Sequence, residues 1–485
     1  MVIAIIALGT LLSWYRVLDQ SLIGEGYYYL FHGLNYGSLT GTLSGMLHSY
    51  EAGAKLLYDI FRTVFRDNIF LYQFFLLASV SVINILFYLF VFVLTEAWLV
   101  AFIASILFSV NFVGFEMFAI GNYQFFAQRT LAFLFLFPSV SLFILYLRKN
   151  QFVYYVMSVF LYFLAFFLFH FTLFFLPYFL CVIAMFLKPK WNVQTILRGM
   201  LIGLPFVLIS LVILRFGNDP VSRDVTVMSF LRDFGGQIPS VMMKHFSILT
   251  VPETVLSYVI HIWKVPHGEA AVRLFYPVAG LYAAALLFLY RTNKKLFPVA
   301  MWSLVFLGPT FFVGLFTRWD MTANLGSGSR YLYVPTVAFA VYWGVVLATV
   351  GKKYLGLFGL VLVMGTWSVM QFSSLSKTFA VEEEKHIAMK ISMQYVKELS
   401  TRLESDAIVI VPSPMGYYGG YFAQLFYGKE HTSFVPFFAD WANELPRPFD
   451  PEKDVILDYD RVNQKVVDKT ADYQAIIAAR TNNSR

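Results

Sequence analysis

Charged residues and cysteines are scarce in this chain. Asp, Glu, Lys and Arg make up 13% of its 485 residues, while 59% are hydrophobic and 19% aromatic. A single water-soluble core cannot bury that much apolar surface, so the composition predicts a polytopic membrane protein whose 53 phenylalanines can face lipid. The one cysteine, Cys181, lies in an apolar run and excludes an intramolecular disulfide.

Several functional motifs are also missing. The sequence contains no metal-ligand cluster, no Walker loop and no dinucleotide-binding fingerprint, and we find no internal repeat. Its formal net charge of +7 does not indicate nucleic acid, because basic residues in such a chain first report membrane topology. We therefore expect the lipid bilayer as a partner and no nucleic acid.

Long apolar runs predict an all-α polytopic membrane bundle of about 11 transmembrane helices within residues 1–372. The first segment lacks a basic flank and a small-residue cleavage site, so we interpret it as a retained span and not as a signal peptide. The predicted spans cover residues 2–14, 69–94, 98–115, 130–147, a pair within 152–187 that turns near His170, 199–215, 271–290, 296–316, 331–350 and a last segment that ends near 372.

Lysine and arginine are concentrated in short loops that fall on one side of the predicted bundle. The positive-inside rule makes that side cytoplasmic, so we expect a cytoplasmic N-terminus in the plasma membrane. The basic loops are residues 148–150, 188–198, 291–295 and 352–353. The segments expected on the extracytoplasmic face are the long loops 16–68 and 216–270, the loops 115–129 and 317–330, and the tail 373–485.

Two kinds of structure are expected outside the spans. Residues 52–66 have helical apolar spacing typical of an interfacial helix, and a second such helix is expected around 228–246. The tail, residues 373–485, has a composition typical of a small soluble α/β domain. Its predicted amphipathic helix carries Ile387, Ile391, Tyr395, Leu399 and Leu403 four residues apart, and its predicted strands are 407–411, 454–459 and 474–479.

Glu25 is the first candidate functional residue. It lies between two glycines, ahead of three tyrosines that begin at Tyr27, close to the point where the first span ends. Burial among aromatic rings would raise the pKa of its carboxyl group and a nearby cation would lower it, so the site could be tuned for acid/base chemistry. The simpler interpretation is a solvated loop acid beside interfacial tyrosines.

His170 and Arg330 are expected on the same face as Glu25. An isolated intramembrane histidine such as His170 is more often a packing residue than a ligand. Arg330 follows the run Gly326–Ser329 and opens a span, where it would be either a snorkelling anchor or a clamp for phosphate.

The order of these features resembles the GT-C superfamily of polytopic glycosyltransferases, particularly the protein O-mannosyltransferase and aminoarabinose transferase-like families 39 and 83. The similar segments are GEGYYYLFHGLNYG at 24–37, LHSYEAGAKLLYDIF at 47–61, NYQFFAQR at 122–129, FLFHFTLFFLPYFL at 167–180 and SRYLYVPTVAFAV at 329–341. Each motif is weak, but their order covers nearly the whole chain.

This resemblance implies an inverting transfer of a sugar from a polyprenyl-phosphate donor to a protein, lipid or glycan acceptor on the extracytoplasmic face. Glu25 would be the general base, and Arg330 with Arg129 would hold the donor phosphate. The remaining residues expected to contact substrate are His48, His170, Asp19 and Tyr27. No cofactor is required, and a divalent metal is compatible with the family without support from this sequence.

One departure from the family leaves alternatives open. Many relatives carry an Asp-Glu pair where this chain has Gly24 and Glu25, and the nearest other acid is Asp19. A catalytically inactive GT-C-like structural subunit, held with partner subunits in a membrane assembly, is one alternative. A transporter of lipid-linked glycans is another, although it would be expected to carry charges within its spans.

Overall fold

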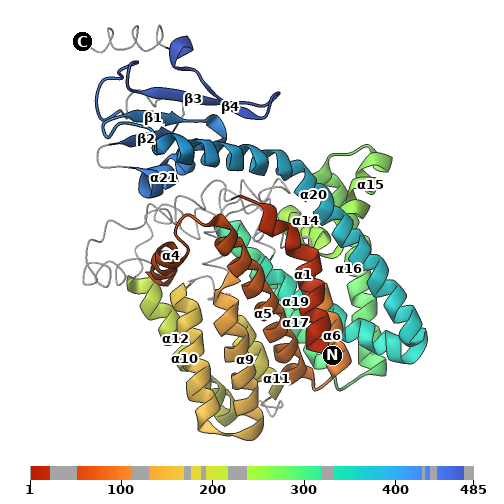
Figure 1. Cartoon of the computed structure of the whole chain (residues 1–485). Coiled ribbons are helices and arrows are strands. Elements are labelled where there is room, and N and C mark those ends of the chain that lie inside the picture. The colour runs from red at the N-terminus through yellow and green to blue at the C-terminus, as the bar shows by residue number, and fades with distance from the viewer. Residues whose placement is uncertain are drawn as a thin grey trace.

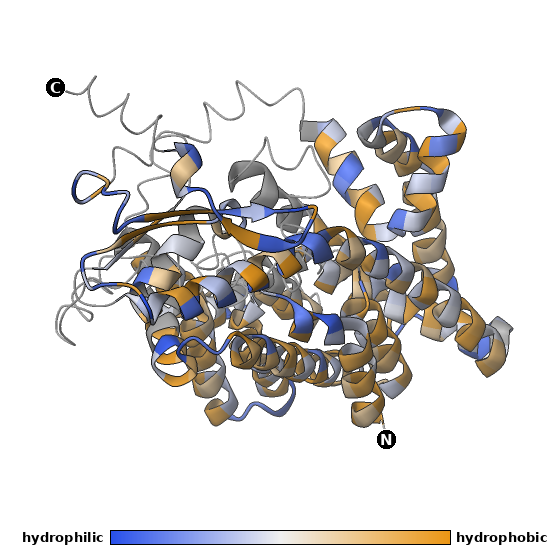
Figure 2. Ribbon diagram, turned by 45° about the horizontal axis from the view of Figure 1, so that its top comes forward, coloured by the Kyte–Doolittle hydropathy of each residue, from blue (hydrophilic) through white to orange (hydrophobic). Residues whose placement is uncertain are grey.

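Apolar segments of this chain form helices that pack side by side, with a small sheet near the C-terminal end (Figure 1). The computed structural model describes residues 2–21, 52–111, 130–168, 176–186, 193–216, 238–317, 333–428, 432–436 and 445–473. Figure 2 shows that the bundle helices are mostly hydrophobic, whereas hydrophilic residues gather in the turns and around the sheet. Helices suit the bilayer because they pair their own backbone polar groups.

Every predicted span coincides with a helix in the described part of the chain. These helices are α1 (Val2–Trp14), α5 (Ile69–Thr95), α6 (Trp98–Ser109), α9 (Ala132–Lys149), α10 (Phe152–Leu168), α11 (Leu176–Phe186), α12 (Val193–Phe216), α16 (His267–Thr292), α17 (Phe297–Thr317), α19 (Tyr333–Val350) and α20 (Gly356–Ser400). Six helical segments among the described residues are long and apolar enough to cross a membrane. The helical fold class is therefore confirmed, and it is compatible with a membrane protein.

Three of the four basic turns, at residues 148–150, 291–295 and 352–353, lie together at one end of the bundle. Glu96 lies between α5 and α6 in a left-handed backbone conformation (φ 55°). Its carboxylate forms ion pairs with Arg148 Nη1 at 3.0 Å and Lys295 Nζ at 3.4 Å. Asn293 Nδ2 donates to Thr349 Oγ1 at 3.1 Å, which brings the end of α19 to the same place. The π-helical turn η7 (Gly351–Leu355), which carries two more lysines, follows directly.

The opposite end of the bundle is joined by different contacts. Trp14 Nε1, at the end of α1, donates to the carbonyl of Ser109 at the end of α6, at 2.9 Å. The helix predicted over residues 52–66 is present as α4 (Ala52–Phe65), which lies across this end (Figure 1). A Cβ on Gly53 would lie 2.6 Å from the carbonyl oxygen of Phe167, so α4 rests directly on the end of α10.

The second long loop contains two helices, α14 (Ile238–Thr250) and α15 (Glu253–Trp263). The first confirms the helix expected near residues 240–246, while residues 228–234 lie outside the described chain. Helix α14 packs along α16, with the Phe246 and Tyr282 rings 4.6 Å apart. The sequence interpretation did not predict α15.

Helix α20 is longer than predicted. It continues for 45 residues along the flank of the bundle and then over its end, beneath the sheet (Figure 1). Neither glycine nor proline occurs between Gly365 and Pro412, so no residue stops the helix where the last span was expected to end. The predicted domain boundary between residues 372 and 373 therefore has no break in secondary structure.

The tail part of α20 is helical as predicted, and its buried face is wider than the predicted apolar row. Met389, Met393 and Val396 are buried, whereas Tyr395, assigned to the apolar face, is 37% exposed. Ile391, Leu399 and Leu403 of the predicted row are partly buried against the core, so the covered face includes most of that row and extends to the methionines beside it.

Strands of the tail form a four-stranded sheet in the order β2-β1-β3-β4. Its elements are β1 (Ile408–Val411), α21 (Gly416–Tyr427), β2 (Ser433–Pro436), β3 (Val455–Asp460) and β4 (Lys465–Asp468), with a short 3₁₀ turn, η8 (Ser413–Met415), before α21. β1 pairs in parallel with β2 and β3, and β4 pairs antiparallel with β3. The α/β character and the strands at 407–411 and 454–459 are confirmed, β2 and β4 were not predicted, and residues 474–479 lie outside the description.

A buried carboxylate holds this sheet to its neighbouring loop. Asp454, whose side chain is fully buried, accepts hydrogen bonds from Arg447 Nη1 at 2.7 Å and Nη2 at 2.6 Å, and from the Ile408 amide at 2.8 Å. The pair with Asp454 raises the pKa of the Arg447 guanidinium above its ordinary value. The Asp454 carboxylate therefore joins the start of β1, the start of β3 and the loop that carries Arg447.

We expect Asp454→Ala to destabilise the tail sheet by roughly 3 kcal/mol, because the change leaves buried donors without an acceptor. Limited proteolysis of the full-length protein should show faster cleavage within residues 405–473. Asp472→Ala, which removes an exposed partner of Lys469, is the matched control and should leave the cleavage rate unchanged. Equal rates for wild type and Asp454→Ala would contradict this assignment.

Candidate functional site

Of the residues predicted to form the site, Asp19 is the one that the structure describes. Glu25, Tyr27, His48, Arg129, His170 and Arg330 lie outside the described residues. Asp19 ends the 3₁₀ helix η1 (Tyr15–Asp19), which continues from α1 at the bundle end opposite the basic turns. The candidate site is therefore built here from Asp19 outwards.

Asp19 lines a cavity of about 320 Å³ between η1 and the tail part of α20. The cavity is lined by Tyr15, Arg16, Asp19, Gln20, Phe379, Glu383, His386, Ile387 and Lys390. It combines charges of both signs with the aromatic rings of one tyrosine and one phenylalanine. The positions on α20 are spaced three or four residues apart, so they share one helix face.

His386 fixes η1 against α20. Its Nδ1 atom accepts a hydrogen bond from the Ser21 amide at 3.1 Å, and its side chain is 3% exposed. This bond requires Nδ1 to be unprotonated, so the neutral ring carries its proton on Nε2. Burial is the largest effect and lowers the pKa of His386 to about 4, although the nearby charge of Glu382 opposes this shift.

Two buried polar atoms beside this contact have no partner among the described residues. They are His386 Nε2, a donor in the neutral ring, and Gln20 Oε1, an acceptor. The Gln20 side chain is 5% exposed, and its backbone carbonyl accepts a hydrogen bond from Gln73 Nε2 at 3.3 Å. Both residues line the cavity, but these two atoms are themselves fully buried.

The charged residues of the cavity are also unpaired in the part of the chain that the structure describes. Arg16, Asp19, Glu383 and Lys390 form no ion pair or hydrogen bond with one another or with any other described side chain. Elsewhere on α20, Lys385 pairs with Glu382 at 2.8 Å and Lys397 with Asp67 at 2.6 Å. Asp19, Glu383 and Lys390 are exposed, so water can solvate these charges.

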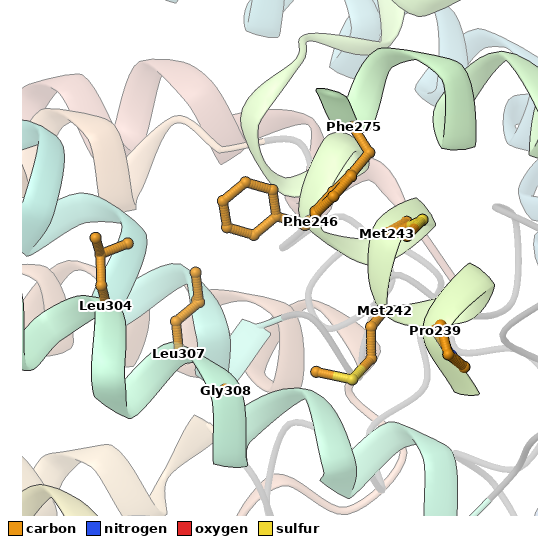
Figure 3. Close-up of a pocket in the computed structure, with 8 residues that line it drawn as sticks. All are labelled: Pro239, Met242, Met243, Phe246, Phe275, Leu304, Leu307 and Gly308. Atoms are coloured by element: carbon orange, nitrogen blue, oxygen red, sulfur yellow. The ribbon is translucent and has the colours of Figure 1, made fainter. Parts of the chain in front are cut away.

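A second cavity, of about 340 Å³, is apolar (Figure 3). It lies between α14, the first half of α16 and the middle of α17, and it is lined by Pro239, Met242, Met243, Phe246, Phe275, Leu304, Leu307 and Gly308. Figure 3 shows the Phe246 ring and the Met242 side chain extending into the space in front of Leu304 and Leu307. Flexible methionines and apolar walls suit a hydrocarbon chain.

Acidic and histidine side chains do not gather into a metal site in the described ranges, where no group of three or more His, Cys, Asp or Glu is close enough to hold an ion. The predicted residues around Glu25 lie outside these ranges. The metal requirement therefore stays a prediction.

Comparison with protein families and with curated proteins finds no match. No protein-family model matches the chain, and no curated protein matches its sequence. The assignment of function therefore depends on the residues themselves.

The sequence interpretation missed most of the polar cavity. Gln20, Glu383, His386 and Lys390 were not named as site residues, and the one available signal was the charged run EEEKHIAMK at 382–390. That run was assigned to a solvated amphipathic helix. Only the continuation of α20 over the bundle end brings it to η1.

We predict that His386 titrates near pH 4, well below the ordinary histidine value of 6.5, because burial disfavours its charged form. Histidine-selective ¹³C labelling and NMR of the full-length protein would measure this, with His386→Gln identifying the signal. The pKa of His386 is lower in the folded protein than in the unfolded chain, so the neutral buried ring makes its full contribution to folding stability above pH 6.5. This contribution falls as the pH decreases toward 4, and at pH 5 the free energy of unfolding should be lower by about 2 kcal/mol. A midpoint near 6.5 would show that the ring is not buried.

Proposed function

We propose that the protein is an integral-membrane glycosyltransferase that moves a sugar from a polyprenyl-phosphate donor to an acceptor on the extracytoplasmic face, with inversion. The observation that carries the proposal is that the chain enters or leaves every predicted site segment at the same end of the bundle. The resemblance of the sequence to the GT-C superfamily supplies the reaction class.

The positions next to the predicted residues are Ser21, Ala52, Thr130, Leu168 and Tyr333, and all lie at helix ends opposite the basic turns. Covalent geometry bounds the distances from these ends, since an extended chain spans at most about 3.6 Å per residue. Glu25 is four residues from Ser21 and therefore within about 14 Å of it. Arg330 is three residues from Tyr333, within about 11 Å. These limits are compatible with one shared site.

We propose eleven membrane crossings, with the basic turns in the cytoplasm. Contacts at the two bundle ends are compatible with alternating directions for α1, α5, α6, α9, α16, α17 and α19. The positive-inside rule then makes the end beside Asp19 extracytoplasmic, together with the tail sheet. A lipid-linked donor would be met at that membrane surface.

The apolar cavity supports a prenyl donor. Its volume of about 340 Å³ and its lining without charged residues fit a few isoprene units. A hydrocarbon chain placed between α14 and α17 would leave its phosphate free to reach the bundle end. We therefore propose this cavity as part of the prenyl path.

The proposed reaction is a direct displacement. The acceptor oxygen or nitrogen attacks the anomeric carbon while Glu25 takes its proton, and the bond between that carbon and the phosphate oxygen breaks. Arg330 and Arg129 would stabilise the negative charge that develops on the departing polyprenyl phosphate. The step needs no cofactor.

Glu25→Gln should reduce transfer by about 10²-fold or more, because the amide cannot accept the proton. Membranes containing the variant would be supplied with a panel of radiolabelled polyprenyl-phosphate sugars. Glu96→Gln, at the opposite bundle end, is the matched control and should retain transfer. Full turnover by Glu25→Gln would remove this residue from the mechanism, and no transferred label from any donor with wild-type protein would refute the function.

Gly308→Phe tests the prenyl path. A Cβ at Gly308 meets nothing within 4 Å, so a large side chain can enter the apolar cavity without displacing the backbone. We expect the apparent KM for a long-chain donor to rise about tenfold with little change for a short-chain analogue. Gly280→Phe on α16, where a Cβ also meets nothing within 4 Å, is the control. Equal effects of both variants would contradict the placement.

A further inference from the structure

We propose that the turn between α19 and α20 binds an acidic phospholipid of the leaflet that meets the basic turns. Its phosphate would lie on Lys352, Lys353 and the end of α16, and its acyl chains along the first turns of α20. This site lies at the opposite end of the bundle from the proposed transfer residues. It requires the helices to cross a membrane, as the proposed function has them, and it does not require sugar transfer.

Positive charge without negative charge is concentrated where α16 ends and α20 begins. No Asp or Glu occurs between Ala270 and Trp319 or between Met321 and Val381, so the charged residues of both segments are all cations. The hydrogen bond from Asn293 to Thr349 holds the end of α16 beside the end of α19. The exposed cations on either side of this contact are Arg291, Lys294, Lys295, Lys352 and Lys353.

These cations favour an acidic lipid over a zwitterionic one. Lys295 pairs with Glu96 at 3.4 Å, and the other four cations form no ion pair within the described part of the chain. Phosphatidylcholine carries a phosphate together with a trimethylammonium group, which the lysines repel, whereas phosphatidylglycerol carries the negative charge alone. Each Lys or Arg at the membrane surface increases the affinity for an acidic lipid about fivefold.

The first turns of α20 offer apolar surface directly beside these charges. Leu357 is 73% exposed and Phe358 is 83% exposed, and both follow Lys353 within five residues. Val361 and Leu362, each 61% exposed, continue the surface one turn further. This part of α20 lies at the outer edge of the bundle (Figure 1). Side chains this exposed suit a hydrocarbon environment, so a lipid with its phosphate on the lysines can place its acyl chains along them.

The turn itself has a defined geometry. Gly356 separates η7 from α20 in a left-handed conformation (φ 64°), which glycine adopts at little cost. The Tyr354 ring packs 5.9 Å from the Phe288 ring of α16, and Lys353 Nζ lies 5.4 Å from the centre of the Tyr354 ring. The cation–π contact therefore positions Lys353 next to the end of α16, where the other cations lie.

The test is native mass spectrometry of the full-length protein, released from nanodiscs that contain equal amounts of phosphatidylglycerol and phosphatidylcholine. We expect the wild-type protein to retain phosphatidylglycerol about tenfold over phosphatidylcholine. The double variant Lys352→Gln/Lys353→Gln should retain the two lipids about equally, because it loses two of the cations that attract the headgroup.

A matched control separates this site from the general effect of basic turns. Lys149→Gln/Arg198→Gln removes two exposed cations from other basic segments and should keep the tenfold preference. A photoactivatable phosphatidylglycerol provides an independent location, since it should label wild-type peptides within residues 351–362.

The outcomes distinguish the lipid site from the proposed function. Equal retention of both lipids by the wild-type protein, an equal loss of preference in the control variant, or labelling confined to other segments would overturn the site. Protein that does not enter nanodiscs would refute the proposed membrane crossings together with the site. A lipid preference that depends on Lys352 and Lys353, without sugar transfer from any donor, would support the site and refute the transferase.

Discussion

Backbone pairing in a medium without water is the constraint on which this structure depends. Each apolar segment must satisfy its own amide and carbonyl groups, so it becomes a helix, and polar side chains inside the bundle need local partners. Asn84 Nδ2 donates to Thr10 Oγ1 at 2.8 Å, and Tyr162 and Ser210 share a hydrogen bond at 2.9 Å. These buried pairs fix neighbouring helices in register while aromatic packing fills the space between them, as where the Phe179 and Phe206 rings lie 4.3 Å apart.

The bundle has two chemically different ends. One gathers basic turns around the carboxylate of Glu96, and the other carries η1, α4 and the approach to the tail sheet. Helix α20 belongs to both, since it begins beside the basic turns and finishes under the sheet. The polar cavity exists because this helix returns over the bundle end and meets Ser21 through His386.

Much of the helical arrangement could be predicted from the sequence, because apolar length and loop charge are local signals. The ends of α5 and α6 around Glu96 were predicted closely for this reason. Helix α21 was not predicted, since Gly419 and Gly420 within it argue against a helix. A Cβ at Gly419 would lie 3.3 Å from Met389 Cε on α20, a tertiary contact that sequence periodicity does not contain.

The candidate site was less predictable than the fold. Asp19 was named because it follows the first span, and its place beside a cavity is found in the structure. Its neighbours His386 and Lys390 are more than 360 residues away in the chain, and no periodic pattern connects positions so distant. Their charges looked like those of any solvated helix, and tertiary packing decides which of them face a cavity.

Glu96 also has a consequence for the order in which the molecule is assembled. Its carboxylate contacts Arg148 and Lys295, and because it is 55% exposed these contacts contribute little to stability. Arg148 leaves the ribosome first, and synthesis of the chain up to Lys295 takes on the order of ten seconds more. The first contact can therefore form while the later helices are still unmade, and the second joins the late-inserted half of the bundle to the early one.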